Sequence, residues 1–281
     1  MPTTIPSNSP APPSQADSEK AVVFDDVSIA FEENVVLKGV SFSLTRGENK
    51  IIFGIAGSGK STLLKLALGL FPPDSGRIEV LGNDVTAMSE QQLFPLRGRI
   101  GMVFQESALF DSLNIRENVA YRLIEDRTLS EQEIEDRVRE ALRFVELERT
   151  VDMFPSELSG GMRRRVAIAR AIVTRPELLF YDSPTGGLDP VTSTTIIELL
   201  LKQRDVYGTS ALVVTHRLQD AYIMATHCFD KKLNRMVPVG ANSKTEVQTT
   251  FVILRDGKVI FDGPASELVN TRDQYIREYI A

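Results

Sequence analysis

Short apolar runs that alternate with polar positions open the folded part of the chain. Residues 22–24, 27–31 and 35–42 are rich in β-branched and aromatic side chains, a pattern that predicts strands of an antiparallel sheet. A buried strand is predicted at 51–54, directly before a cluster of glycines, and an apolar helix at 61–70 follows that cluster. The order strand, glycine loop and helix forms half of a βαβ unit.

Later in the chain, strand-sized apolar runs alternate with helical patterns. Strands are predicted at 177–182 and 211–215, and helices at 191–207 and 218–226. This alternation is typical of an α/β sheet.

A mostly helical stretch separates the two strand-rich parts of the chain. Its clearest helix begins at a capping box, since Ser130 lies three residues before Glu133. We expect an inserted helical subdomain at about residues 96–173.

Three segments lie outside this α/β pattern. Residues 1–20 are biased toward proline, serine and alanine, which indicates a disordered N-terminal tail before one predicted domain at 21–265. Residues 266–281 are expected to form a C-terminal helical extension. Residues 229–249 form a predicted insertion with a basic start; a solvated hairpin or loop is the simpler interpretation, and a lipid-facing or partner site is the alternative.

Composition narrows the classes of function. The chain has 281 residues, of which 42% are hydrophobic, enough for a large buried core. A formal net charge of -6 gives no electrostatic reason to expect a nucleic-acid partner. The single cysteine excludes an internal disulfide framework. No apolar run approaches the roughly 18 residues of a membrane-spanning helix, so we do not expect the chain itself to cross a bilayer.

A glycine-rich loop after the strand at 51–54 carries the clearest candidate chemistry. The loop is formed by Gly54, Ile55, Ala56, Gly57, Ser58, Gly59, Lys60 and Ser61. It matches the phosphate-loop pattern, in which backbone N–H groups point at phosphate oxygens near a helix N-terminus. Lys60 is expected to reach the β and γ phosphates, Ser61 to bind Mg²⁺ through its hydroxyl group, and Thr62 to contact phosphate. The alternative is a chance glycine turn, but the flanking strand and helix favour a nucleotide site.

An apolar strand that ends in a carboxylate gives the second candidate. Residues 178–182 end at Asp182, and the C-terminal edge of a parallel sheet places such an aspartate beside the metal ion of a nucleotide site. An apolar run that ends in aspartate is common. The assignment of Asp182 to Mg²⁺ therefore depends on the phosphate loop upstream.

A serine-glycine loop lies between these two motifs. Residues 158–162 read Leu-Ser-Gly-Gly-Met and precede a basic amphipathic segment at 163–171. This loop resembles the signature loop of ABC ATPases, and all the motifs follow in that family's order. The resemblance implies ATP as the nucleotide and an α/β fold, the P-loop NTPase of the ABC type, with a mixed core sheet, an antiparallel β subdomain and an inserted helical subdomain. It also implies that Ser159, Gly160 and Gly161 bind the γ-phosphate held by a second copy of the chain. Ser159 is by local logic also a candidate helix N-cap.

Four further positions match the same family. Gln105 resembles the loop glutamine that contacts Mg²⁺ and moves with the transmembrane partner, and His216 resembles the switch histidine at the γ-phosphate. Asp189 resembles the aspartate that crosses the dimer interface, although it is also a candidate N-cap. Phe31 stands where an aromatic side chain stacks on adenine, and the alternative is a strand residue of the core.

Ser183 departs from the family pattern. Members usually carry glutamate directly after the metal-binding aspartate, as a general base or water-orienting group, whereas this chain reads Asp182-Ser183-Pro184. A hydroxyl group is not basic at neutral pH, and loss of a positioned base typically costs about 10²- to 10⁴-fold in rate. We expect nucleotide binding and closure to survive. Hydrolysis then depends on compensation from His216 or another carboxylate, for which Glu106 is a candidate.

Within the family, the chain is similar to the ATPases of lipid transporters that use MCE proteins, the Mla-like systems. Segments 104–114, 117–120 and 155–162 carry this resemblance. It implies a bacterial transport ATPase on the cytoplasmic face of the inner membrane, paired with integral membrane permease subunits that connect it to an MCE-type lipid-binding protein. The implied cargo is phospholipid or a related lipid. Ser183 leaves open a non-hydrolysing regulatory subunit, and a soluble ABC protein acting on nucleic acid is less favoured because the chain has one cassette and an acidic balance.

Overall fold

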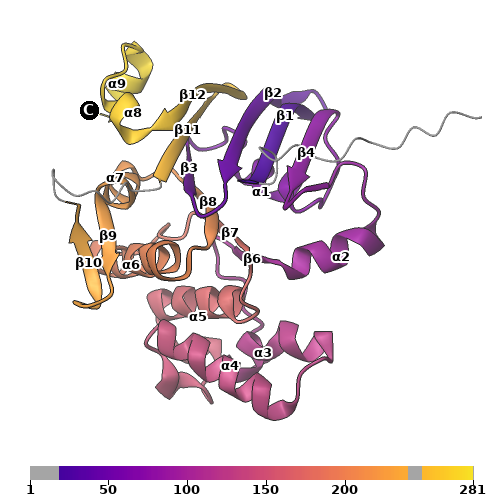
Figure 1. The fold of residues 1–281 in the computed structure, drawn as a ribbon, viewed down its shortest axis with the longest axis vertical. Helices are drawn as coiled ribbons and strands as arrows, with labels where there is room; N and C mark the ends of the chain where they lie inside the picture. The colour runs from indigo at the N-terminus through magenta and orange to yellow at the C-terminus, as the bar shows by residue number, and fades with distance from the viewer. Residues whose placement is uncertain (1–18, 240–248, 281) are drawn as a thin grey trace, which may run out of the picture.

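The computed structural model describes residues 19–239 and 249–280 (Figure 1). The predicted tail at 1–20 lies outside the described residues except for its last two, and Lys20 already begins the first strand. In the part of the chain that the structure describes, no helix is both long enough and apolar enough to span a membrane.

A six-stranded sheet forms the centre of the molecule, with the strand order β12-β11-β3-β8-β7-β6. Its strands are β3 (Asn49–Phe53), β6 (Ile100–Val103), β7 (Leu178–Asp182), β8 (Ser210–Thr215), β11 (Thr249–Arg255) and β12 (Lys258–Pro264). Neighbours from β11 to β6 pair in parallel, and β12 pairs antiparallel to β11. The strands predicted at 51–54, 177–182 and 211–215 are confirmed as β3, β7 and β8, with small differences at their ends.

A four-stranded antiparallel sheet, in the order β2-β1-β4-β5, carries the N-terminal strands. Its strands are β1 (Lys20–Phe31), β2 (Asn34–Thr45), β4 (Ser75–Val80) and β5 (Asn83–Asp84). The runs predicted as separate strands at 22–24 and 27–31 belong to one strand. The polar residues Asp25 and Asp26 between them form an irregularity in the pairing with β2, not a turn, and Asp26 has a left-handed φ of 50°.

Nine α-helices and a hairpin account for most of the remaining described residues. They are α1 (Lys60–Ala67), α2 (Glu90–Gly98), α3 (Ile115–Asp126), α4 (Glu131–Phe144), α5 (Gly160–Ile172), α6 (Pro190–Tyr207), α7 (Leu218–Thr226), α8 (Ala265–Val269), α9 (Gln274–Ile280), and the strands β9 (His227–Asp230) and β10 (Arg235–Pro238). Together with the mixed sheet and the antiparallel sheet, these helices confirm the predicted fold class. The capping box predicted before α4 is present, since the Ser130 hydroxyl accepts a hydrogen bond from the Glu133 N–H group at 3.3 Å. α1 ends before the predicted residue 70, and Gly69 has a left-handed φ of 63°.

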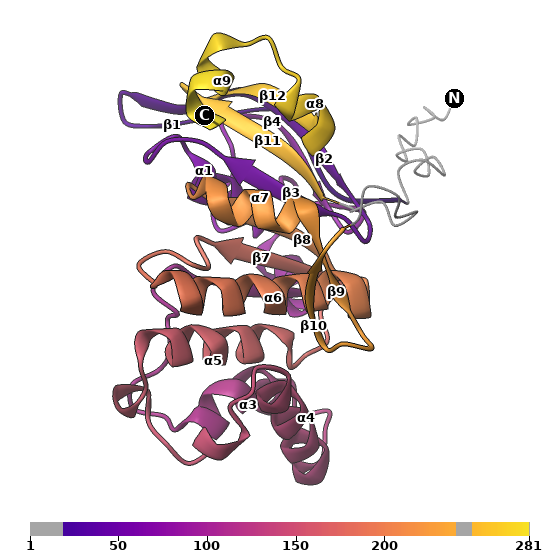
Figure 2. The ribbon, with the colours of Figure 1, turned by 90° about the vertical axis from the view of Figure 1, so that its left-hand side faces the viewer.

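Alternate residues of the central strands contribute to two separate cores. Helices α5, α6 and α7 lie on one face of the sheet, with α3 and α4 packed against α5 on its far side, and α1 and the antiparallel sheet pack on the other face (Figure 2). In β3, Ile51 and Phe53 belong to the first core and Ile52 to the second, as the two-residue period of a strand requires.

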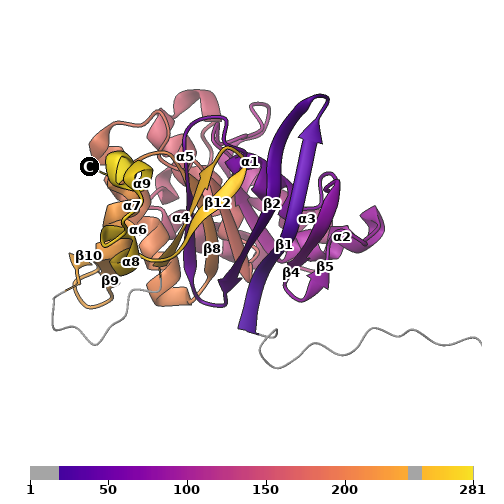
Figure 3. The ribbon, with the colours of Figure 1, turned by 90° about the horizontal axis from the view of Figure 1, so that it is seen from above.

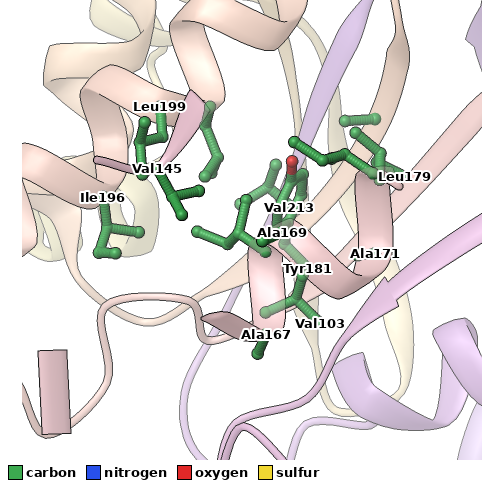
Figure 4. Close-up of a cluster of buried hydrophobic side chains, with 14 of the residues drawn as sticks. Val103, Val145, Ala167, Ala169, Ala171, Leu179, Tyr181, Ile196, Leu199 and Val213 are labelled. Atoms are coloured by element: carbon green, nitrogen blue, oxygen red, sulfur yellow. The ribbon is translucent and has the colours of Figure 1, made fainter. Parts of the chain in front are cut away.

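Small side chains bring α5 close to the sheet in the first core. Figure 4 shows Val103, Tyr181 and Val213 of the sheet beside Ala167 and Ala171 of α5. The hydroxyl group of Tyr181 lies among these apolar groups, and the described residues offer it no hydrogen-bond partner. Burial raises the pKa of this hydroxyl, so Tyr181 stays neutral.

The hairpin of β9 and β10 overlaps the predicted insertion at 229–249, of which residues 240–248 lie outside the described part. Figure 3 shows this hairpin on the side of the molecule away from the antiparallel sheet. The hairpin is attached to α6, because the N–H group of Phe229 donates a hydrogen bond to the Asp205 carboxylate at 2.7 Å. The described part of the insertion is therefore a hairpin that packs against α6.

Candidate nucleotide-binding site

The segments that follow four parallel strands emerge at one edge of the central sheet. β3 leads into the loop at 54–59, β6 leads to Gln105, β7 ends at Asp182, and β8 leads to His216. Because these strands run in the same direction, their C-terminal ends share one edge. The parallel pairing therefore brings together candidate residues that are far apart in the sequence.

Lys60 lies inside the curve of the glycine loop. Its ammonium group donates hydrogen bonds to the carbonyl of Gly54 at 2.9 Å and the carbonyl of Ile55 at 2.6 Å, and it lies 3.3 Å from the Ser58 hydroxyl. Lys60 is only 8% exposed. Burial lowers the pKa of Lys60, and the nearby charge of Asp182 opposes this shift. The loop thus holds the Lys60 ammonium group at a position from which it can exchange its hydrogen bonds to the loop carbonyls for hydrogen bonds to phosphate oxygens.

Two glycines of this loop are required by close packing and backbone conformation. A Cβ atom at Gly54 would lie 2.6 Å from the carbonyl oxygen of Leu254. Gly59 caps α1 with a left-handed φ of 93°, and a Cβ atom there would lie 2.8 Å from Leu37. Larger residues at either position would displace the loop from the sheet.

Asp182 and Ser183 are buried at the end of β7, with 9% and 7% of their surface exposed. Ser183 has a left-handed φ of 47°, and its N–H group donates to the carbonyl of Val214 at 2.8 Å. Its hydroxyl oxygen is 3.5 Å from the Asp182 carboxylate. The serine is therefore fixed beside the candidate metal ligand, but it presents a short neutral group.

The donor set fits magnesium bound together with a nucleotide. Ser61, Gln105 and Asp182 offer a hydroxyl, an amide oxygen and one carboxylate, which are the hard oxygen ligands that Mg²⁺ prefers. Among residues 19–239 and 249–280, no group of three or more His, Cys, Asp or Glu side chains could hold a metal ion. Such a site needs the phosphates of the nucleotide to complete the shell of ligands.

The serine-glycine loop begins α5 on the other face of the sheet. The Ser159 hydroxyl accepts a hydrogen bond from the Met162 N–H group at 3.2 Å, so the predicted N-cap role is observed. Gly160 is exposed, whereas a Cβ atom at Gly161 would lie 2.4 Å from the Thr192 side chain of α6. Gly160 is thus free to meet a ligand, and Gly161 is already needed to pack α5 against α6.

Asp189 caps α6 next to this loop. Its carboxylate accepts hydrogen bonds from the N–H groups of Val191 and Thr192, each at 3.0 Å. The predicted N-cap role of Asp189 is therefore also confirmed. The side chain remains exposed, which leaves it accessible from outside the chain.

One copy of the chain does not unite all the predicted site residues. The buried side chains of α1, which follows the glycine loop, belong to one core, and those of α5 belong to the core on the opposite face. Ser159 and Lys60 therefore lie on different faces. His216 and Gln105 are exposed at the shared edge.

Phe31 lies at the end of β1 and is 46% exposed. Its ring contacts the ring of Phe71 edge-on, with 5.5 Å between centroids. The alternative that Phe31 is a core strand residue is therefore wrong. An exposed aromatic face is available for stacking.

A polar cluster that no local sequence pattern indicates joins the segments after β7 and β8. Arg217 donates hydrogen bonds to the carbonyl of Thr185 at 3.0 Å and to the Ser193 hydroxyl at 2.7 Å. The Thr185 hydroxyl donates to the buried carboxylate of Asp220, whose pKa is raised by burial. This cluster ties the segment that carries His216 to the segment that carries Ser183.

Comparison with known proteins places these features in a family. The sequence profile of the ABC transporter family matches residues 37–186. The intermembrane phospholipid transport system ATP-binding protein MlaF of Escherichia coli K12 is 35% identical over 248 residues, which cover 86% of this chain and 92% of that protein. The chloroplastic protein TRIGALACTOSYLDIACYLGLYCEROL 3 of Arabidopsis thaliana is 34% identical, and the match covers 94% of this chain and 74% of that protein. The methionine import ATP-binding protein MetN of Bifidobacterium longum is 36% identical over 79% of this chain and 57% of that protein.

Solved structures share the fold. A dimeric ATP-binding cassette in a post-hydrolysis state, bound to ADP and Pi, has a TM-score of 0.71 and 30% sequence identity, and covers 86% of this chain and 98% of that chain. The cbiO1 protein of Clostridium perfringens, part of the ABC transporter complex cbiONQ, has a TM-score of 0.73 and 28% identity over 92% of this chain and 94% of that chain.

Replacing Lys60 by methionine removes the ammonium group and keeps the length of the side chain. We expect the affinity for ATP with Mg²⁺ to fall by about 10- to 150-fold, because a hydrogen bond to a charged group is worth about 1.5–3 kcal/mol. Isothermal titration calorimetry measures the affinity, and Lys65→Met, on the exposed side of the same helix, is the matched control. Equal affinities in the wild type and in Lys60→Met would exclude Lys60 from phosphate binding.

Proposed function

Because this chain belongs to the family of ABC transporter ATP-binding proteins, we propose that it is the ATPase subunit of a lipid transporter. The observation that carries the proposal is the meeting of Lys60, Asp182, Gln105 and His216 at one edge of the sheet. The similarity to a phospholipid transport protein along 86% of this chain supports phospholipid or a related lipid as the cargo. The similarity to a methionine import protein supports the ATP-binding role without specifying a lipid.

The active unit is a pair of copies. The glycine loop and the N-terminus of α5 lie on opposite faces of one chain, and both are accessible at the same edge of the sheet. A two-fold axis at that edge would bring Lys60 of each copy opposite Ser159 and Gly160 of its partner. Each ATP then lies between two chains, and Asp189 stands at the interface.

Within each site, the chain's own groups bind and orient ATP. Lys60 and the loop N–H groups hold the β and γ phosphates, Phe31 stacks on the adenine, and His216 contacts the γ-phosphate. Ser61, Gln105 and Asp182 hold Mg²⁺, which when bound neutralises charge on the phosphates. Ser183 cannot accept a proton from water at neutral pH, so we expect slow hydrolysis and a long-lived closed dimer.

A groove beside the loop after β6 offers a docking site for the membrane subunits. It has a volume of about 450 Å³ and is lined by residues that include Ile100, Met102, Phe104, Ala108, Phe110 and Tyr121. The rings of Phe110 and Tyr121 are 4.7 Å apart, and these side chains are 42% and 39% exposed. Exposed aromatic side chains in a groove are typical of a binding surface for an amphipathic helix. A permease helix in this groove would place the chain on the cytoplasmic face of the inner membrane and connect it, through the permease, to an MCE-type protein.

Replacing Phe110 by aspartate should separate the chain from its membrane subunits. We expect a purified detergent complex of wild-type chain to contain permease subunits and bound phospholipid, and the Phe110→Asp complex to lose at least about 90% of the permease, since a charge in an apolar contact remains unpaired. Mass spectrometry of proteins and lipids measures both. Tyr222→Asp, at a 62% exposed aromatic residue of α7, is the control. A wild-type complex without lipid, or without permease, would contradict the proposed transport function.

Replacing Ser159 by aspartate should prevent ATP-driven dimerisation. Aspartate and asparagine are both good N-caps, so Ser159→Asp and Ser159→Asn should keep α5 intact. The aspartate adds a negative charge opposite the partner's phosphates, and we expect at least about a tenfold weaker dimer in Ser159→Asp than in Ser159→Asn. Light scattering with ATP and Mg²⁺ measures the dimer. Equal dimerisation of the two variants would place Ser159 away from the phosphates.

Restoring the family's glutamate should accelerate hydrolysis. We expect Ser183→Glu to raise the single-turnover rate by at least about tenfold, because a positioned carboxylate can orient water and accept its proton. Rapid-quench measurement in the membrane complex compares the two proteins, and Ser183→Gln is the control for size. If the wild type turns over quickly and Ser183→Glu is neutral or slower, Ser183 is not a missing base. A wild type that binds ATP and never hydrolyses it would instead support the regulatory alternative.

A further inference from the structure

Two arginines of α5 hold the loop that follows β6. Arg170 donates hydrogen bonds to two carbonyls of the loop, at 2.7 and 2.9 Å, and Arg164 donates to the carbonyl of Phe104 at 2.8 Å. Between these contacts Ser107 has a left-handed φ of 65°, a conformation that persists in non-glycine residues when neighbours impose it. The backbone on both sides of Glu106 is therefore fixed by α5.

Arg164 also reaches the segment that follows β7. Its side chain is almost fully enclosed, with 5% of the residue exposed, and its second terminal nitrogen lies 3.5 Å from the carbonyl oxygen of Gly186. Burial lowers the pKa of Arg164, and the nearby charges of Glu106 and Asp182 oppose this shift. Its Nε–H group has no hydrogen-bond partner in the described part of the chain. A buried cation thus joins the loop after β6 to the segment after β7.

The two segments that Arg164 joins also meet beside Ser183. A Cβ atom at Gly186 would lie 3.4 Å from the Cβ atom of Ser183 and 4.0 Å from the Cγ atom of Gln105. Gln105 directly precedes Glu106. The loop that carries Glu106 therefore borders the position where this chain has a serine.

We propose that Glu106 orients the water that attacks the γ-phosphate, and that Arg164 is the positioning residue that holds the loop of Glu106, through the Phe104 carbonyl, beside the site. Both statements rest on the proposed ATPase function. Glu106 accepts a hydrogen bond from the water. The water oxygen forms a bond to the γ-phosphorus while the bond from phosphorus to the bridging oxygen breaks, ADP keeps the electron pair, and a water proton passes to the released phosphate. Glu106 thereby supplies the carboxylate that Ser183 does not.

The test compares Glu106→Gln in two backgrounds, in the assembled membrane complex. In the wild-type background we expect the single-turnover rate to fall by about 10- to 100-fold, the loss expected for a water-positioning carboxylate. In the Ser183→Glu background the same substitution should change the rate less than about threefold, because a second carboxylate is present. Asp111→Asn, an exposed carboxylate in the same loop, is the matched control.

Two further measurements separate this role from a structural one. ATP affinity should be unchanged in Glu106→Gln, and the ATP-bound dimer, followed by light scattering, should live longer by the same factor by which hydrolysis slows. In an Arg164→Gln background, Glu106→Gln should have less than about a threefold further effect, since the loop that carries Glu106 is no longer held beside the site there.

Two results would overturn the inference. The first is hydrolysis of ATP by Glu106→Gln at the wild-type rate. The second is an equal loss of activity in Glu106→Gln whether position 183 holds serine or glutamate. Failure of the wild type to bind ATP is a different result, because it would overturn the proposed function and this inference with it.

Discussion

The shared direction of β3, β8, β7 and β6 is the constraint on which the rest of the molecule depends. Parallel neighbours require crossover connections over the faces of the sheet, and here those connections are helices. α1 leaves β3, α6 leaves β7, and α5 runs back to enter β7, so the N-termini of all three helices lie toward the same edge. Each N-terminus carries a partial positive charge, which favours phosphate, although Asp189 already caps the first N–H groups of α6 and Ser159 caps one of α5. The direction of the strands thus determines where an anion can bind before any side chain is considered.

Buried charges are concentrated where these connections meet. Lys60, Arg164 and Asp220 are each less than 10% exposed. Lys60 forms hydrogen bonds within its own loop, Arg164 bonds to the loop after β6, and Asp220 bonds to the segment after β7. Burying a charge costs free energy that a well-packed apolar residue would not cost. The benefit is positional, because Lys60 holds the loop after β3 in shape, while Arg164 and Asp220 fix the segments after β6, β7 and β8 relative to one another.

Local sequence patterns predicted the parts of the fold that local interactions determine. The glycine loop, the capping box at Ser130 and the N-caps at Ser159 and Asp189 depend on neighbours within a few residues, and the sequence contains them. The contact between Thr185 and Asp220 could not be read in this way, since it exists only because β7 and β8 are adjacent.

The sequence around Arg164 contains a pattern that indicates the burial of this side chain. Arg164 stands in a run of three arginines, of which it alone is buried, and it shares a helical stripe with Ala167, Ile168 and Ala171, at offsets of three, four and seven residues. The site itself was predictable as a set of residues. The resemblance already implied that Ser159, Gly160 and Gly161 serve a second copy, but the reason that one chain keeps them away from Lys60 was not readable, because it depends on which core each helix joins.

The position of a water-orienting carboxylate has a consequence for coupling. A glutamate at position 183 would directly follow β7, whose five residues are all buried. Its position relative to ATP would therefore depend on dimer closure. Glu106 instead lies in a loop whose neighbours Phe104 and Ala108 line the groove beside α3 and α5. A membrane subunit that binds this groove would act directly on the loop, and a shift of about 1 Å in a reacting group is enough to change a rate about 100-fold. If Glu106 orients the water, hydrolysis in this chain responds to the docking surface as well as to the partner copy, and Arg164 is the side chain through which the two responses meet.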